Sequence, residues 1–275
     1  CLLGSHSTGA DACEEGGTRV AEKGETSSKP RRRGLADDIE ASGDRARYGL
    51  IWRLAMPVLL QNFLGMFVGW SDSILAGQIL GDPVLLAAGV VSGYLLWFME
   101  SIGAVIFVGS QAIISRLLGA RNTRDANTIL GQSITLAILL GVLLTVGVMI
   151  AADLAAQLLN QNGPAGKAVA VYLRIVAVSS VPMMILVVGT SCLRAAGHNQ
   201  PTMVIYLIVN AVNIAVSWLL AIGVGPIPPL GWEGIAAGTA ISFFIGGLAT
   251  LVVLRRGFVD LKLSSIPWIP DRPAT

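Results

Sequence analysis

The sequence has few of the residues from which disulfide frameworks and metal sites are built. It contains 3 cysteines and 2 histidines, and both Cys1 and Cys13 stand in a polar amino-terminal stretch. Neither their number nor their spacing fits a disulfide framework or a cysteine–histidine metal site. The sequence also has no nucleophile beside a base and no phosphate-binding loop, which argues against an enzyme. We therefore expect no cofactor and no metal ion.

Charged residues are scarce as well, and they are unevenly distributed. Only 13% of the residues are charged and 53% are hydrophobic, which gives a mean hydropathy of +0.69. Of the 36 charged residues (19 basic and 17 acidic), 17 lie in residues 1–47. This stretch has too few apolar residues to form a core, so we expect a disordered cytoplasmic tail. The overall charge of +2 does not indicate a nucleic-acid partner, and the composition of the remainder is that of a membrane protein.

Beyond the tail, the hydropathy pattern predicts six membrane-spanning helices. A helix of about 20 apolar residues, rising about 1.5 Å per residue, crosses a hydrocarbon layer of about 30 Å. The predicted spans are residues 51–80, 84–118, 125–154, 167–193, 201–224 and 234–254. The sequence therefore predicts an all-α, polytopic membrane protein, with a six-helix bundle at residues 48–258 and a cytoplasmic linker at 259–275.

The basic residues predict how these helices are oriented. If the spans alternate in direction, every lysine and arginine except Lys167 and Arg174 falls on the same side as both termini. Cytoplasmic loops of membrane proteins carry an excess of basic residues. We therefore expect a multi-pass protein of the plasma membrane with both termini in the cytoplasm.

The most informative single residue is Asp72, which stands inside the apolar run of the first span. An ionisable group within a membrane span is costly and usually marks a functional site. Gln61 falls on the same helical face as Asp72 at about 100° per residue, which places it as a cavity-lining residue. Pro57 stands 15 residues before the acid and removes a backbone donor, so it is the candidate for a bend in this helix.

The fifth span has a polar face that reaches the same depth as this acid. Tyr206, Asn210, Asn213 and Ser217 share that face, and Tyr172 of the fourth span arrives at a comparable height. These groups could line a cavity in the outer half of the bundle. Alternatively, they could satisfy one another between helices as ordinary packing.

Glu100, Asp153 and Arg174 are further charged residues within the predicted spans. Glu100 lies in the middle of the second span, where it could face a cavity or be paired structurally. Asp153 and Arg174 lie near the outer ends of their helices, where we expect them to extend toward water or to pair with each other.

Glycine pairs spaced four residues apart predict close helix packing. They are Gly65/Gly69, Gly89/Gly93 and Gly234/Gly238. Small residues at this spacing let two helix backbones approach, although glycine is also generally common in membrane helices.

Several of these stretches together resemble one transporter family. The resemblance covers residues 50–260, and the segments that carry it are Asp72-Ser73-Ile74-Leu75-Ala76-Gly77, Leu86-Ala87-Ala88-Gly89, Ser115-Arg116-Leu117-Leu118-Gly119-Ala120, Tyr172-Leu173-Arg174, Leu193-Arg194-Ala195-Ala196-Gly197, Asn213-Ile214 and Gly234-Ile235-Ala236-Ala237-Gly238-Thr239. In their order and spacing they resemble the multidrug and toxin extrusion (MATE) family.

The resemblance implies a secondary antiporter that exports organic cations or drugs in exchange for protons or sodium ions. It implies that Asp72 carries the coupling cation, with Tyr172, Asn213 and Thr239 nearby. The chain departs from the family pattern where some members have a second acid, since that position is Ser217. Proton and cationic substrate are then expected to compete for the Asp72 carboxylate.

The length of the chain bears on this interpretation. Members of the family have twelve spans in two six-helix lobes, so the chain is expected to be an amino-terminal half. The second lobe would be a covalent continuation or a second copy in a homodimer. Two other interpretations stay open: a flippase for lipid-linked sugars from the same superfamily, and a truncated membrane fragment that transports nothing.

Overall fold

The computed structural model describes most of the predicted membrane region. The described residues are 44–80, 83–158, 163–223, 228–257, 261 and 263. The predicted tail lies outside them except for its last four residues, which begin the first helix, and the predicted linker lies outside them except for Leu261 and Leu263. The contact pattern separates residues 1–47 from the unit Tyr48–Thr275, and the helical arrangement below is that of the second unit.

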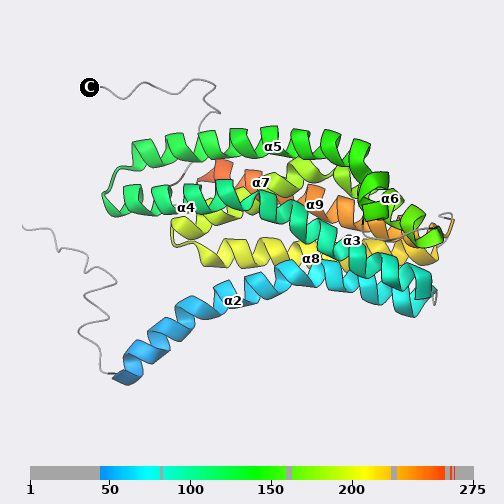
Figure 1. Cartoon of the computed structure of the whole chain (residues 1–275). Coiled ribbons are helices and arrows are strands. Elements are labelled where there is room, and N and C mark those ends of the chain that lie inside the picture. The colour runs from blue at the N-terminus through cyan, green and yellow to red at the C-terminus, as the bar shows by residue number, and fades with distance from the viewer. Residues whose placement is uncertain are drawn as a thin grey trace, which may run out of the picture. The chain divides into compact units, whose positions relative to one another are not determined.

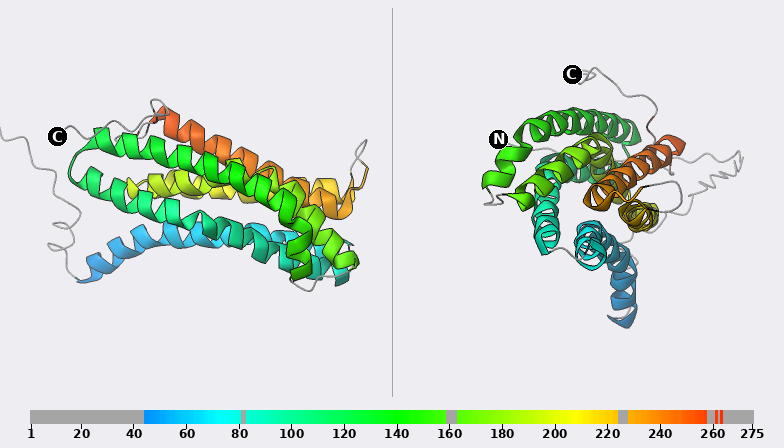
Figure 2. Two further views of the ribbon diagram at one scale, coloured as in Figure 1. Left: turned by 45° about the horizontal axis from the view of Figure 1, so that its top comes forward. Right: turned by 90° about the vertical axis from the view of Figure 1, so that its right-hand side faces the viewer.

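The described chain is all-α, as the sequence predicts. Its helices are α2 (Asp44–Leu75), the π-helical turn η1 (Ala76–Leu80), α3 (Pro83–Ile102), α4 (Ala104–Gly119), α5 (Thr123–Leu158), α6 (Pro164–Ala177), α7 (Ser180–Ala195), α8 (Asn199–Ile222) and α9 (Gly231–Arg256). In Figure 1 and in the right-hand view of Figure 2, α5 lies at one edge of the bundle and α2 at the opposite edge, with α7, α8 and α9 between them.

Two of the predicted spans are broken helices. Five helices are long and apolar enough to cross a membrane, and the number is six if α6 and α7, which meet at 63°, form one bent span. The break follows Ala177, and Ser179 spans it by donating backbone and side-chain hydrogen bonds to the Val176 carbonyl. Pro182 then stands in the first turn of α7, where a backbone donor is not needed.

The second broken span consists of α3 and α4, which meet at Gly103. Its N–H bonds to the Glu100 carbonyl at 3.0 Å, which is a tighter turn than that of an α-helix. A side chain at this position would approach Met184 Sδ to 3.0 Å. The interruption therefore lies one turn beyond Glu100, inside a run that is apolar throughout in the sequence.

The closest helix pair is α8 and α9, which pack backbone against backbone. A Cβ atom at Gly234 would lie 2.6 Å from the carbonyl carbon of Leu220, and one at Gly238 would lie 2.7 Å from Ser217 Cα. The close packing predicted for this glycine pair is confirmed. It brings the polar face of α8 against α9, where the functional side chains meet.

Many large apolar side chains of the unit are exposed, which fits a protein whose solvent is lipid. On α2 and α3 they include Trp52, Phe63, Trp70, Tyr94 and Phe98.

Candidate functional site

Asp72 is buried near the end of α2, in contact with three other helices. Only 2% of the residue is exposed. The Tyr172 hydroxyl of α6 and the Thr239 hydroxyl of α9 each donate a hydrogen bond to Oδ2 at 2.5 Å. The Asn213 amide of α8 donates to Oδ1 at 3.1 Å. The carboxylate therefore joins four helices through three neutral donors.

The donors are themselves connected to one another. Asn213 Nδ2 also donates to Thr239 Oγ1 at 2.9 Å, so this hydroxyl accepts from the amide while it donates to the acid. Ser71, the neighbour of Asp72, donates to Asn213 Oδ1 at 2.5 Å. Each group thus fixes the direction in which the next group donates its proton.

Tyr172 is held in place by its surroundings. Its ring lies against that of Trp232, with the ring centroids 5.2 Å apart and the planes tilted by 32°. The Trp232 indole N–H donates to the Ala168 carbonyl of α6 at 2.7 Å. These contacts direct the Tyr172 hydroxyl at the acid from a fixed ring.

Among the described residues, the Asp72 carboxylate has no ionic partner. The ion pair found in this part of the chain joins Arg174 Nη2 to Asp153 Oδ2 at 2.6 Å. Both of those side chains are substantially exposed, in agreement with the expectation that they pair with each other near a surface. In the described part of the chain, no group of three or more histidine, cysteine or acidic residues could hold a metal ion.

The other residues placed in the site by sequence lie one turn or more from the acid. Ser217 donates to the Ile235 carbonyl at 3.2 Å and joins α8 to α9. Asn210 donates to the carbonyls of Leu64 and Tyr206, both at 2.8 Å, and so joins α8 to α2. Gln61 is buried on α2, and its Oε1 has no hydrogen-bond partner among the described residues. Pro57 lies within α2, which curves along its length (Figure 1), but its side chain is outside the described set.

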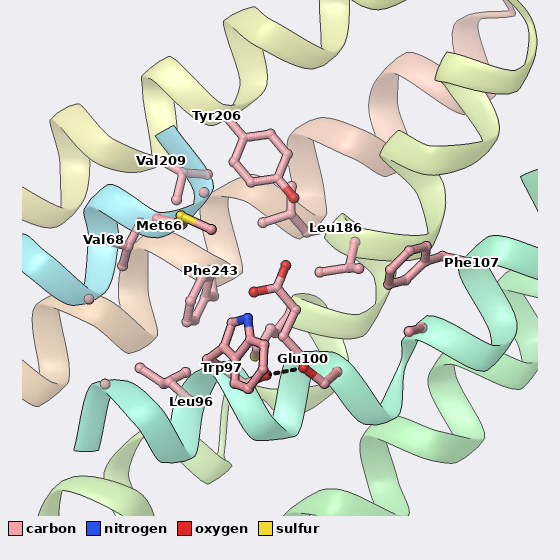
Figure 3. A pocket seen from close by; sticks show the side chains of 17 residues that line it. Met66, Val68, Leu96, Trp97, Glu100, Phe107, Leu186, Tyr206, Val209 and Phe243 are labelled. Carbon is pink, nitrogen blue, oxygen red and sulfur yellow. Dashed lines mark hydrogen bonds between the residues drawn. The ribbon is translucent and has the colours of Figure 1, made fainter. Parts of the chain in front are cut away.

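Glu100 lies outside the Asp72 group. Its carboxylate projects into a cavity bordered by Trp97, Phe107 and Tyr206, as Figure 3 shows. The structure thus separates Glu100 from Asp72.

Sequence reasoning missed two supporting residues. Ser71 could have been suspected from its position beside Asp72. Trp232 gave no signal, because a tryptophan at the start of a membrane helix is ordinary at an interface.

The described geometry can now be compared with known proteins. The MatE family model matches residues 57–219, which is more than half of the chain. The chain belongs to the MATE family. This matched region contains Asp72, Tyr172 and Asn213, and Thr239 lies beyond it.

Curated relatives of this MATE chain are named as transporters or resistance proteins. A probable multidrug resistance protein NorM of Thermotoga maritima is 26% identical over 217 residues, which cover 78% of this chain and 46% of that protein. The probable multidrug resistance protein YoeA of Bacillus subtilis is 30% identical over 217 residues, covering 75% of this chain and 45% of YoeA. The MATE chain thus spans about half the length of these relatives.

Solved structures show the same fold. A crystal structure of MATE in the bent conformation matches with a TM-score of 0.72 at 24% identity, covering 84% of this chain and 50% of that one. An outward-facing multidrug resistance MATE transporter of the MOP superfamily matches with a TM-score of 0.67 at 24% identity, with coverages of 78% and 47%. This MATE chain is therefore a multi-pass membrane protein with the helical arrangement of the family.

Proposed function

We propose that the chain is the amino-terminal half of a secondary active antiporter. It exports organic cations or drugs across the plasma membrane in exchange for protons or sodium ions, and both of its termini are cytoplasmic. The second lobe is a covalent continuation or a second copy of the chain. The observation that carries this proposal is the buried Asp72 carboxylate, which three neutral donors from three different helices surround.

A proton at this carboxylate would rearrange the hydrogen bonds around it. An ionised carboxylate only accepts hydrogen bonds, whereas a protonated one also donates. Oδ2 accepts from both Tyr172 and Thr239. A proton on Oδ2 requires at least one of these hydroxyls to stop donating to it and either to accept from it or to turn away, which changes the hydrogen bonds that join α6 and α9 to α2. Ion binding at Asp72 is thereby coupled to helix position, as an exchange mechanism requires.

A sodium ion would act on the same bonds. Hard cations prefer oxygen ligands, and the cluster offers the carboxylate of Asp72 together with the hydroxyl oxygens of Tyr172 and Thr239. Either ion therefore competes with the hydrogen bonds that join the four helices.

The test is ion-driven efflux from proteoliposomes that contain either the chain alone or the chain with the second lobe. A pH gradient and a sodium gradient are imposed separately, and efflux of N-methylacridinium is followed by fluorescence. We expect the wild type to respond to at least one gradient and Asp72→Asn to neither, while Asp153→Asn keeps the wild-type rate as a matched control. Gradient-driven efflux at the wild-type rate from Asp72→Asn would overturn the proposal.

A further inference from the structure

The chain has a second feature that the Asp72 cluster does not use, a cavity that is open on the side where Met66 and Trp97 are exposed. The cavity has a volume of about 250 Å³ and lies among α2, α3, α4, α7, α8 and α9. Six of the 17 residues that line it are aromatic or sulfur-containing, and among them are Met66, Trp97, Met183, Tyr206 and Phe243. The one ionisable carboxylate among the residues that line it is that of Glu100.

The cavity lies one helical turn from the Asp72 cluster on three helices at once. Val68 on α2 and Val209 on α8 line the cavity, and each stands four residues before a member of the cluster, Asp72 or Asn213. Phe243 on α9 also lines it and stands four residues after Thr239. Four residues of helix correspond to about 6 Å of rise. We call these three side chains, Val68, Val209 and Phe243, the apolar layer.

The apolar layer separates two different chemical environments. On one side the Asp72 carboxylate accepts three hydrogen bonds. On the other side no described residue donates a hydrogen bond to the Glu100 carboxylate, which extends into the cavity toward Tyr206 (Figure 3). A carboxylate in largely apolar surroundings attracts a cation strongly, because little solvent competes for it.

Among the described residues, one basic side chain interacts electrostatically with this carboxylate. Arg194, in the last turn of α7, interacts electrostatically with both Glu100 and Tyr206. It also donates a hydrogen bond to Ser191 in its own helix. Arg194 is therefore a resident positive charge that partly offsets Glu100 without a direct salt bridge to it, and a cation in the cavity must compete with it.

The walls of the cavity favour a cation that carries an apolar body. Trp97 stands three residues before Glu100 on α3, beside the carboxylate in Figure 3. An indole face attracts cations, and the thioether of Met183 packs well against aromatic rings. A planar aromatic cation of two or three fused rings matches both the size and the lining of this cavity.

We propose that Glu100 binds the charged group of a lipophilic aromatic cation in this cavity, and that the cation competes there with Arg194. The inference rests on the proposed function only for the assumption that the transported molecule is a cation. It assigns substrate and coupling ion to two different carboxylates on opposite sides of the apolar layer. The two ligands then influence each other through Val68, Val209 and Phe243 rather than by competing for the same oxygens.

The test compares a cation with a neutral molecule of nearly the same shape. N-methylacridinium is permanently charged, whereas acridine is neutral at pH 8. Binding of each to the purified whole chain in detergent is measured by fluorescence titration, without any ion gradient. We expect the wild type to bind the cation at least tenfold more tightly than acridine.

The variants assign this difference to particular residues. Glu100→Gln is expected to weaken cation binding at least tenfold while changing acridine binding less than twofold. Asp72→Asn, the matched acid on the other side of the layer, is expected to change cation binding less than threefold. Arg194→Gln is expected to tighten cation binding about threefold.

Several outcomes would overturn the inference. These are equal affinity for the two compounds, a Glu100→Gln affinity within twofold of the wild type, or a larger loss from Asp72→Asn than from Glu100→Gln. Weaker cation binding by Arg194→Gln would overturn the competition. If Glu100→Gln cannot be recovered as monodisperse protein, Trp97→Leu replaces it. We expect Trp97→Leu to weaken binding of the cation about fivefold and to leave binding of acridine unchanged. A variant that binds both compounds as the wild type does, or that loses affinity for both equally, would contradict the inference.

The inference and the proposed function can fail separately. Binding that depends on Glu100, without gradient-driven efflux, would leave this site standing and remove the proposed antiport. Efflux that depends on Asp72, with cation binding unaffected by Glu100→Gln, would support the proposed antiport and remove the Glu100 site.

Discussion

The Tyr172 hydroxyl donates a 2.5 Å hydrogen bond to Asp72 across 100 residues of sequence, and this bond ties the short helix α6 to α2. The Tyr172 hydroxyl reaches the acid from α6, and α6 meets α7, the other half of the same bent span, at 63°. The break in that span thus provides a separate short helix that carries one of the three donors. Movement of α6 relative to α7 would change the hydrogen bonding of the acid directly.

Removal of this hydroxyl gives the first prediction. Tyr172→Phe keeps the ring against Trp232 but removes a donor to a buried carboxylate, which should lower the stability by about 1.5–3 kcal/mol. Thermal unfolding in detergent measures the effect. Tyr94→Phe is the control, because Tyr94 is exposed and should tolerate the change. Equal melting temperatures for the two variants would argue against a structural role for the bond.

Replacing either of two glycines with alanine should change the stability of the protein, but in opposite directions, because their surroundings differ. A Cβ at Gly238 would lie 2.7 Å from Ser217 Cα, so Gly238→Ala should force α8 and α9 apart and destabilise the protein by about 1–3 kcal/mol. Gly147 in α5 has no atom within 4 Å of that position, so Gly147→Ala should stabilise its helix by about 0.5–1 kcal/mol. The difference is read from the shift of the unfolding transition. A neutral Gly238→Ala would show that the two helices are less tightly packed than described.

The Asp153–Arg174 pair is predicted to matter little. Its side chains are 60% and 45% exposed, and exposed ion pairs contribute about 0–1 kcal/mol. Asp153→Asn should therefore change the unfolding midpoint only slightly, and raising the salt concentration should remove the remaining difference. A loss as large as that of Tyr172→Phe would mean that the pair has a role in function or folding beyond its surface position.

The proposed orientation can be tested by labelling single cysteines in intact cells. In a background without the native cysteines, we expect a membrane-impermeant thiol reagent to reach cysteines introduced at Pro164 and Pro228 from outside. A cysteine at Arg121, on the predicted cytoplasmic side, should react only after the membrane is opened. The opposite labelling pattern would reverse the orientation of the whole bundle.

The sequence predicts the cluster better than it predicts the helices that carry it. Depth and helical face bring Asp72, Asn213 and Tyr172 together, because periodicity and rise per residue are properties of any helix. Thr239 came only from the family resemblance. The breaks at Gly103 and after Ala177 could not be found in this way, since the hydropathy continues across both. They depend on contacts such as the approach of Met184 to Gly103, which are fixed only when the helices pack.

The separation of Glu100 from Asp72 has a similar cause. Both acids stand inside apolar runs of the sequence, which left open whether Glu100 faces a cavity. The distinction depends on which side chains fill the space between the helices. Phe243 is one of these side chains. Nothing in the sequence distinguishes it from the other apolar residues of α9, and its place between the cavity and the Asp72 cluster follows only from the packing of the helices.

The backbone contact between α8 and α9 limits which parts of the bundle can move. With Gly234 and Gly238 against α8, neither helix can slide or rotate against the other without steric overlap, so the two form a rigid post. Helix α2 instead meets that post through side-chain hydrogen bonds from Asn210, Asn213 and Thr239, which can be exchanged one at a time. We therefore infer that α2 can move relative to a fixed α8–α9 post, and amide hydrogen exchange should be slowest along the facing turns of that post.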